Sequence, residues 1–481
     1  MKSESKTEKN EFRTTKKIAA CGMILGLLLL GSVTHLQASD PCPNGDPLTF
    51  SRALDMMVAR NEAILSAASE VEQKQYEARA TRGLNLPRVT MSGEFARISD
   101  SIDLDLDGIR NVILALHPEI PSAAVPSFYE TIQEDTLFVS QLNATWPVYT
   151  GGKIKAAKRA ADAAIRESEA KLRRTEDTLA SELAQYYFSV RLAGQVYKIR
   201  NEVLDALNIH LYQARRLQEE GFIARTEVLH AQVAHAQAER ELKASRRDLE
   251  LAELALANIL AADRALTPST PLFLLESVDP EASFISQARL NHPALDQLQA
   301  VQDKAGENLR AAKSELYPTV FLFGTREIYE RNLTDYAPSW AVGAGINFTL
   351  FDGRARANKI LAARKMEDQA GLMRRKVARD LATLVSSRYQ AMMKASEQYD
   401  SLQASLDLAE ENLRARKRSF EEGMATSLDV VDAQLSLSAI QVERMQAAYS
   451  FDVTLAQLLE ACGRGIEFPR YLDGAIMEVE H

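Results

Sequence analysis

The 481-residue sequence predicts a mainly α-helical fold with a membrane-embedded β part, in which one structural plan occurs twice along the chain. Two stretches, from Gly152 to Gly221 and from Gly353 to Gly423, contain no proline and only one further glycine each. These stretches align with each other at a constant offset of 202 residues. Short segments with an apolar-polar alternation of period two lie between the helical stretches. Each copy is therefore predicted to read helix, β-hairpin, long helix, glycine turn and returning helix.

Residues 1–38 are predicted to be a secretory signal peptide that is removed. Lys16 and Lys17 precede an apolar run at residues 18–33, and Ala38 offers a small residue at the cleavage site. This run of 16 residues is shorter than the ~20 that a membrane-spanning helix needs. We therefore expect an exported mature protein and interpret the run as a cleaved segment, with a membrane anchor as the alternative.

Charge and cysteine content restrict the possible partners and the redox state. A formal net charge of -9 and the lack of a Lys/Arg-rich block exclude nucleic acid as the main partner, because phosphate binding needs clustered cations. Cys42 and Cys462 remain after export. In an oxidising compartment they are a disulfide candidate, and two unpaired thiols are the alternative, because the sequence does not give their Cα separation.

The two long glycine-to-glycine stretches are each predicted to be a single helix about 100 Å long. The motif Glu-Glu-Gly at residues 219–221 recurs at residues 421–423, and residues 87–89 pair with residues 318–320 at a second offset of 231. The two offsets differ by 29 residues, so the first copy carries an insertion of that size. We place this insertion at residues 100–136 and interpret it as an external loop.

The chain is accordingly divided into two repeats and a short end. The first structural repeat is predicted at residues 39–270, with its β-hairpin at residues 87–148. The second is predicted at residues 271–463, with its hairpin at residues 318–350. Residues 464–481 form a separate C-terminal segment.

The predicted strands carry apolar side chains on one face. Apolar residues, including Trp146 and Trp340, alternate with small or polar residues in segments 89–95, 137–148 and 340–350. This pattern is typical of transmembrane β-strands, and half-buried strands in a soluble sheet are the alternative. Two hairpins supply four strands, which cannot close a barrel on their own, and backbone groups in lipid must all be paired. We therefore expect the chain to oligomerise.

The sequence contains no constellation typical of an enzyme, so we expect neither catalysis nor a cofactor. It has neither a Gly-x-Ser-x-Gly elbow nor a phosphate-binding glycine loop. Residues 103–108 match the opening of a calcium-binding EF-hand loop, but Leu114 occupies the position of the required bidentate Glu. Weak cation binding is the most we expect there. His230 and His235 are separated by about 140° on a helix and are not expected to share a metal.

The duplicated plan and the motifs at its glycine turns resemble the TolC family of outer-membrane efflux ducts. In residues 220–229 and 422–433, a glycine turn is followed by a polar residue and an acidic-Val-aliphatic triplet. The glycine-containing sequences at 150–152 and 352–354, after the second and fourth strands, are also typical of this family. The resemblance covers nearly all of the mature sequence.

This resemblance implies a homotrimer that forms a 12-stranded β-barrel in outer-membrane lipid, continued by a periplasmic α-helical barrel. It also implies a passive outer-membrane channel of a tripartite export system in a Gram-negative bacterium. The channel would receive small toxic molecules or drugs from a periplasmic adaptor protein and an inner-membrane pump. The alternatives are the outer-membrane duct of type I protein secretion and, less favoured, a periplasmic coiled-coil scaffold without a channel.

The resemblance further assigns residues near the two glycine turns. Six tip residues are expected to contact the adaptor: Gly221, Phe222, Ile223, Gly423, Met424 and Ala425. A plain helix–helix connection is the alternative for these turns. The expected gate at the tunnel entrance consists of Asp429, Asp432 and Glu227, whose carboxylates would form rings in a trimer. The alternative for the two aspartates is a solvated helix start, where the helix dipole favours acidic residues.

The chain also departs from the family pattern at this tip. Phe420 and Ala425 stand where the family's best-known member has the Tyr and Arg that tie its closed tip, and Glu227 replaces an Asp. We expect that network to be absent or rebuilt, with Arg225 as a candidate participant. The family also brings both chain ends to a belt around the tunnel together with residues 267–280, which favours a bond between the two cysteines.

Overall fold

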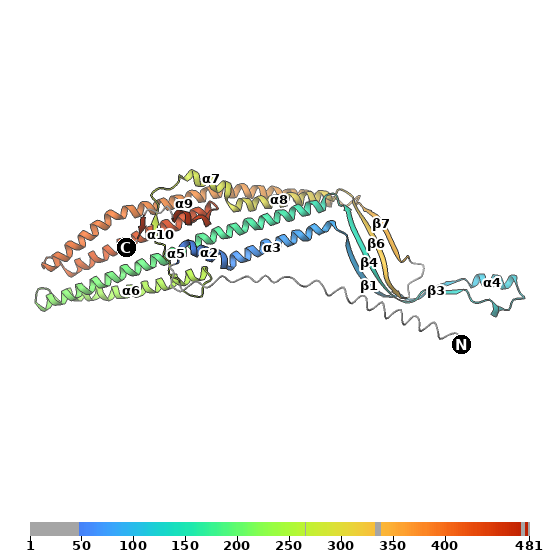
Figure 1. Cartoon of the computed structure of the whole chain (residues 1–481), viewed down its shortest axis with the longest axis horizontal. Helices are drawn as coiled ribbons and strands as arrows, with labels where there is room; N and C mark the ends of the chain where they lie inside the picture. Colours follow the sequence, from blue (N-terminus) through green and yellow to red (C-terminus); the bar gives the residue numbers. More distant parts are fainter. Residues whose placement is uncertain (1–47, 265, 332–337, 473–476, 480–481) are drawn as a thin grey trace. The chain divides into compact units, whose positions relative to one another are not determined.

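The computed structural model describes residues 48–264, 266–331, 338–472 and 477–479 (Figure 1). The predicted signal peptide at residues 1–38 and Cys42 lie outside the described residues. Among the described helices, none combines the length and apolarity that crossing a membrane requires.

The predicted duplication is confirmed by the helices. The first repeat contains α2 (Phe50–Arg60), α3 (Glu62–Arg82), α5 (Lys153–Glu219) and α6 (Arg225–Ile259). The second contains α7 (Glu281–Asn291), α8 (Pro293–Ser314), α9 (Ala355–Glu421) and α10 (Ser427–Ala461). Helices α5 and α9 have 67 residues each, and α6 and α10 have 35 each. The first and last residues of α5 and α6, each increased by 202, are the first and last residues of α9 and α10. The two repeats therefore have the same helix lengths.

Each repeat has a break near its start that the sequence pattern does not predict. Asn61 separates α2 from α3, and His292 separates α7 from α8. The side chain of Asn61 accepts a hydrogen bond from the Ala63 N–H, and Nδ1 of His292 accepts one from the Ala294 N–H, both at 3.0 Å. These contacts satisfy an otherwise unpaired N–H of each new helix, so both residues act as N-caps.

Four strands form one antiparallel sheet in the order β1-β4-β6-β7. Their bounds are Arg88–Arg97 for β1, Thr136–Tyr149 for β4, Thr319–Arg331 for β6 and Trp340–Asn347 for β7. The predicted last strand extends to residue 350, but β7 ends at Asn347, which pairs with Thr319. The residue before Thr319 is Pro318, which has no N–H to donate to a further pair.

One face of this sheet is apolar and exposed, as the alternation predicts. Met91 lies opposite Leu142, and Trp146 lies opposite Leu322 in the neighbouring strand. Exposure reaches 68% for Met91 and 73% for Val342. The other face carries polar side chains, such as Asn143, whose side chain donates a hydrogen bond to the Ser92 hydroxyl, together with Phe321 and Phe323, which lie over Gly345 and Gly343. The sheet therefore presents an apolar surface to its surroundings, as strands in lipid do.

The predicted insertion at residues 100–136 contains secondary structure of its own. It contains β2 (Ile102–Asp105), α4 (Asp107–Leu116), the 3₁₀ helix η2 (Ser122–Ala124) and β3 (Tyr129–Gln133). Oδ1 of Asp107 accepts a hydrogen bond from the Phe128 N–H at 2.8 Å, and the Arg110 guanidinium donates to the carbonyl oxygens of Ser122 and Val125. These contacts order the segment, and they use a carboxylate from the EF-hand-like motif as a structural acceptor.

The main hydrophobic core unites both repeats and the C-terminal segment. The Phe188 ring lies 5.8 Å from Phe50 and 5.9 Å from Phe468 between ring centroids. The Tyr187 hydroxyl donates to the Leu48 carbonyl at 2.6 Å. Nearby, β5 (Leu272–Leu274) pairs with β8 (Met477–Val479), and η3 (Gly465–Glu467) and α11 (Pro469–Leu472) follow α10.

Cys462 is fully buried in this core. Its thiol donates to the carbonyl oxygen of Phe284 at a distance of 3.5 Å. Burial raises the pKa of the Cys462 thiol to about 12, which disfavours the reactive thiolate. Because Cys42 lies outside the described residues, the bond between the two cysteines stays a prediction.

Candidate functional site

The candidate site lies where two long helical hairpins end together. Helix α5 packs against α6 and α10, and α10 packs against α9. The turns that connect α5 to α6 and α9 to α10 lie at the same end of these helices (Figure 1). A buried cluster there includes side chains from all four helices: Leu211, Ala214, Val228, Ala231, Phe420 and Val430. We call this end of the hairpins the tip.

Both tip turns have the same backbone structure. Gly221 and Gly423 have φ angles of +83° and +73°, which residues with a Cβ rarely adopt. The N–H of Phe222 donates to the Leu217 carbonyl, and that of Met424 donates to the Ser419 carbonyl, both at 2.8 Å. These are the hydrogen bonds of a Schellman motif, which ends a helix with a left-handed residue.

The six predicted tip residues differ in exposure. Phe222 and Met424, which correspond to each other in the two repeats, are each 73% exposed. Ile223 and Ala425 are half-buried and pack against the tip cluster. The two turns therefore present one large apolar side chain each to the surroundings and use the next residue for packing.

The carboxylate of Asp429 is part of a helix cap. Its Oδ2 accepts hydrogen bonds from the Thr426 hydroxyl at 2.7 Å and the Thr426 N–H at 2.9 Å, and these bonds hold the pKa of Asp429 below its usual value. Arg416 of α9 approaches the other oxygen at 3.3 Å. Asp432 is exposed one turn further along α10. Asp429 thus stabilises the helix start, and both carboxylates remain at the tip.

Glu227 links the two repeats. It lies in the first turn of α6, but its Oε2 accepts a hydrogen bond from the N–H of Ser427, the first residue of α10, at 2.7 Å. A carboxylate at a helix N-terminus satisfies an unpaired N–H and interacts favourably with the helix dipole. The predicted gate residue Glu227 therefore holds the helix that carries Asp429 and Asp432.

Two residues absent from the predicted site, His210 and Ser427, complete this connection. Nε2 of His210 lies 2.7 Å from Oγ of Ser427, and the two residues are 4% and 0% exposed. The His210 ring packs on Phe420 with 4.7 Å between ring centroids. We call the four residues Glu227, Ser427, His210 and Phe420 the tip lock.

Phe420 and Glu227, two positions at which the sequence departs from the family pattern, both belong to the tip lock. Phe420 contributes its ring to His210, while the polar link runs through Glu227 and Ser427. Arg225, the candidate named from the sequence, is exposed. The position of His210 on the apolar seam of α5 could be read from its spacing to Leu207 and Ala214, but its partner could not.

Burial keeps the His210 imidazole of the tip lock uncharged. Burial and the nearby Lys417 of α9 lower the pKa of His210 to about 4, and Glu227 acts in the opposite direction. Burial also lowers the pKa of Lys417. The imidazole is therefore neutral at neutral pH.

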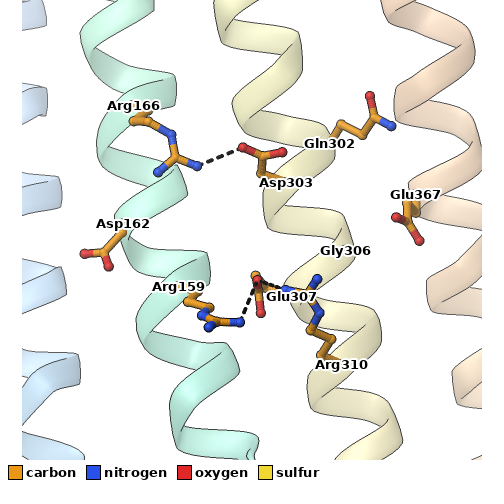
Figure 2. A pocket seen from close by; sticks show the side chains of 9 residues that line it. All are labelled: Arg159, Asp162, Arg166, Gln302, Asp303, Gly306, Glu307, Arg310 and Glu367. Atoms are coloured by element: carbon orange, nitrogen blue, oxygen red, sulfur yellow. Dashed lines mark hydrogen bonds and ion pairs between the residues drawn. The ribbon is translucent and has the colours of Figure 1, made fainter.

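A second polar site lies between α5, α8 and α9 (Figure 2). It is a cleft of about 340 Å³ in which arginines from α5 and α8 face carboxylates of α8. Arg166 approaches Asp303 at 2.8 Å, and Glu307 lies between Arg159 and Arg310. We interpret this cleft as an ion-pair network that fixes α8 on α5. Across the described ranges, no group of three His, Cys, Asp or Glu side chains is placed to hold a metal ion.

The family profile described as outer membrane efflux protein matches residues 53–262 and 284–464. Outer membrane efflux protein BepC of Brucella suis biovar 1 is 25% identical over 317 residues, which cover 63% of this chain and 67% of BepC. Protein CyaE of Bordetella pertussis is 26% identical over 342 residues, 67% of this chain and 65% of CyaE. The chain thus aligns with about two thirds of the length of these curated relatives.

The fold is also similar to that of a solved channel structure. A crystal structure of CusC, described in terms of transmembrane channel formation, has a TM-score of 0.73 at 17% sequence identity. The similarity covers 86% of this chain and 92% of the CusC chain. At this level of identity the comparison shows the shared fold.

Proposed function

The chain belongs to the outer membrane efflux protein family, and we propose that it is the outer-membrane channel of a tripartite export system. The observation that carries this proposal is the combination of an exposed apolar sheet face with two helical hairpins whose tips converge. The sheet provides a lipid-facing surface, and the hairpins extend from it as the wall of a conduit. Members of this family are channels, which favours a passive role over an enzymatic one.

The proposed assembly is a homotrimer. Strands β1 and β7 are the edges of the sheet, and each presents unpaired backbone groups on its outer side. Such groups must be paired in lipid, so β7 of one copy would pair with β1 of the next. Three copies would then close a barrel of twelve strands in the outer membrane, continued by a helical tunnel in the periplasm.

The proposed partners act at the tip. Phe222 and Met424 expose apolar side chains on adjacent turns, which suits contact with the helical hairpin of a periplasmic adaptor protein. The adaptor would connect the channel to an inner-membrane pump that supplies the energy.

Small toxic molecules are the proposed cargo. The name of BepC describes an efflux protein, which favours this cargo over the polypeptides of type I secretion. A periplasmic scaffold without a channel is disfavoured because its sheet would expose the apolar side chains of Trp146 and Val342 to water.

Membrane flotation and bilayer recording test the proposed function. We expect the mature protein to float with outer membranes, to migrate as a heat-modifiable trimer on gels, and to form ion-conducting channels in planar bilayers. A mature protein that stays in the water-soluble fraction and forms no channels would contradict the proposal.

Replacing both Asp429 and Asp432 by Asn is expected to weaken block of the channel by multivalent cations. Each carboxylate contributes about 1 kcal/mol to the attraction of a nearby charge in water, so loss of two rings should raise the half-blocking concentration about tenfold or more. Single-channel recording with a trivalent cation measures this. Asp432→Asn alone separates the charge effect from the helix cap, and Asp400→Asn, at an exposed site elsewhere on α9, is the control. Unchanged block in the double variant would remove these residues from the gate.

A further inference from the structure

The tip lock joins all four helices that meet at the tip. His210 comes from α5, Glu227 from α6, Phe420 from α9 and Ser427 from α10. Ser427 is bound twice, because its N–H donates to Glu227 and its hydroxyl lies 2.7 Å from His210. Both contacts cross from the first repeat to the second. Separation of the two hairpins must therefore break both contacts together.

Ser427 also sets the position of the predicted gate carboxylates. It is the first residue of α10, and Asp429 and Asp432 follow within the next two turns. A rotation or fraying of this first turn would displace both carboxylates. The contacts that fix Ser427 thus fix the geometry of the tunnel entrance.

The surroundings of His210 disfavour a positive charge on its imidazole. Ser427 faces it from α10, Phe420 and Lys417 from α9, and Glu227 from α6. Lys417 repels an imidazolium and Glu227 attracts it. The ring is 4% exposed, so a charged form would lose nearly all of its hydration.

We propose that His210 and Ser427 are positioning residues of the tunnel entrance, and that protonation of His210 releases the α9–α10 hairpin from the α5–α6 hairpin. The entrance is held shut at neutral pH and loosened by acid. The consequence for conduction rests on the proposed channel function, whereas the release itself does not.

The direction of the pH effect follows from the two states of the imidazole. With the two hairpins in contact the pKa of His210 is lowered to about 4, and in separated hairpins the hydrated ring returns towards its ordinary value of 6.5. The separated state then binds the proton more tightly, so acid favours separation. The equilibrium between joined and separated hairpins favours the joined state most strongly above pH 6.5. Below this pH, the equilibrium constant shifts toward separation by up to about tenfold for each pH unit, and the shift levels off near pH 4.

Hydrogen–deuterium exchange of the purified full-length trimer tests the release. We expect protection of the amides at the start of α10, corrected for intrinsic exchange, to fall about tenfold or more between pH 7 and pH 5. In His210→Gln, whose amide can reach the same hydroxyl but does not titrate, protection should stay constant over this range. The matched control is His230→Gln, at an exposed position on α6, which should behave as the wild type.

A second variant keeps the test decisive if His210→Gln does not form trimers. Ser427→Ala retains the N–H that binds Glu227 and removes the hydroxyl that binds His210, so its protection should be lower than that of the wild type at both pH values. Wild-type protection that does not change with pH, or an equal pH response in His210→Gln, would overturn the inference.

Bilayer recording separates this inference from the proposed function. We expect the open probability of the wild type to rise from pH 7 to pH 5 and that of His210→Gln to stay level. If the open probability changes neither with pH nor with the substitution, the result would contradict the inference and leave the channel function intact. A protein that never conducts would contradict the channel function, and the exchange measurement would still decide the release.

Discussion

Replacing Val342 by Arg is expected to reduce the amount of trimer assembled in the outer membrane by more than tenfold. Val342 is 73% exposed on the apolar face of the sheet, opposite Gly324 in β6. An Arg facing lipid near the middle of the bilayer costs about 2–4 kcal/mol per chain. Even the lower figure corresponds to more than a tenfold change in the assembly equilibrium, and each of the three copies in a trimer would add this cost.

The control for this substitution lies one residue away. Ala341 has its side chain on the opposite face of the same strand, so Ala341→Arg introduces the same group on the side away from lipid. We expect Ala341→Arg to assemble nearly as the wild type does. Fractionation of outer membranes followed by unheated gel electrophoresis measures both variants. Equal assembly of Val342→Arg and Ala341→Arg would show that the apolar face does not contact lipid.

Replacing Phe188 by Ala is expected to destabilise the protein by about 3–5 kcal/mol per chain. The Phe188 side chain is 0% exposed and lies in the core where several chain segments meet. Its ring is within 6.0 Å of Phe273 and 5.9 Å of Phe468 between centroids, so the substitution leaves a cavity between the second repeat and the C-terminal segment. The expected result is a lower midpoint of thermal unfolding and trimers that dissociate at lower temperature.

Leu290 provides the control for the core substitution. It is 79% exposed on α7, so Leu290→Ala should change the free energy of unfolding by no more than about 0.5 kcal/mol. Thermal melts of detergent-solubilised protein measure both variants under the same conditions. Similar midpoints for the two variants would mean that the aromatic cluster does not limit stability.

Much of the fold follows from the sequence because helices and strands have different local periods. The lack of proline between Gly152 and Gly221 predicts a continuous helix, and α5 spans residues 153–219. Alternation predicts which side of β1, β4 and β7 is apolar, since successive side chains point to opposite faces. The constant offset of 202 residues predicts the second copy from the first, and α9 repeats the 67 residues of α5.

Other features depend on contacts that no local period describes. The insertion folds because the Asp107 carboxylate meets the Phe128 N–H, 21 residues away in sequence. The breaks at Asn61 and His292 depend on side chains that cap new helices, and His is not among the preferred N-cap residues. A search for metal sites directs attention to His230 and His235, whereas the buried histidine of the tip is His210.

The duplicated plan, the helix lengths, the apolar face of the sheet and the place of the two glycine turns could all be predicted from the sequence, because each depends on residues close together in the chain. The contacts that hold the tip together could not be predicted in this way. Glu227 meets Ser427 across 200 residues, and His210 meets it across 217. Periodicity assigns a side chain to a face of its helix, but its partner on another helix depends on how the helices pack and in which register.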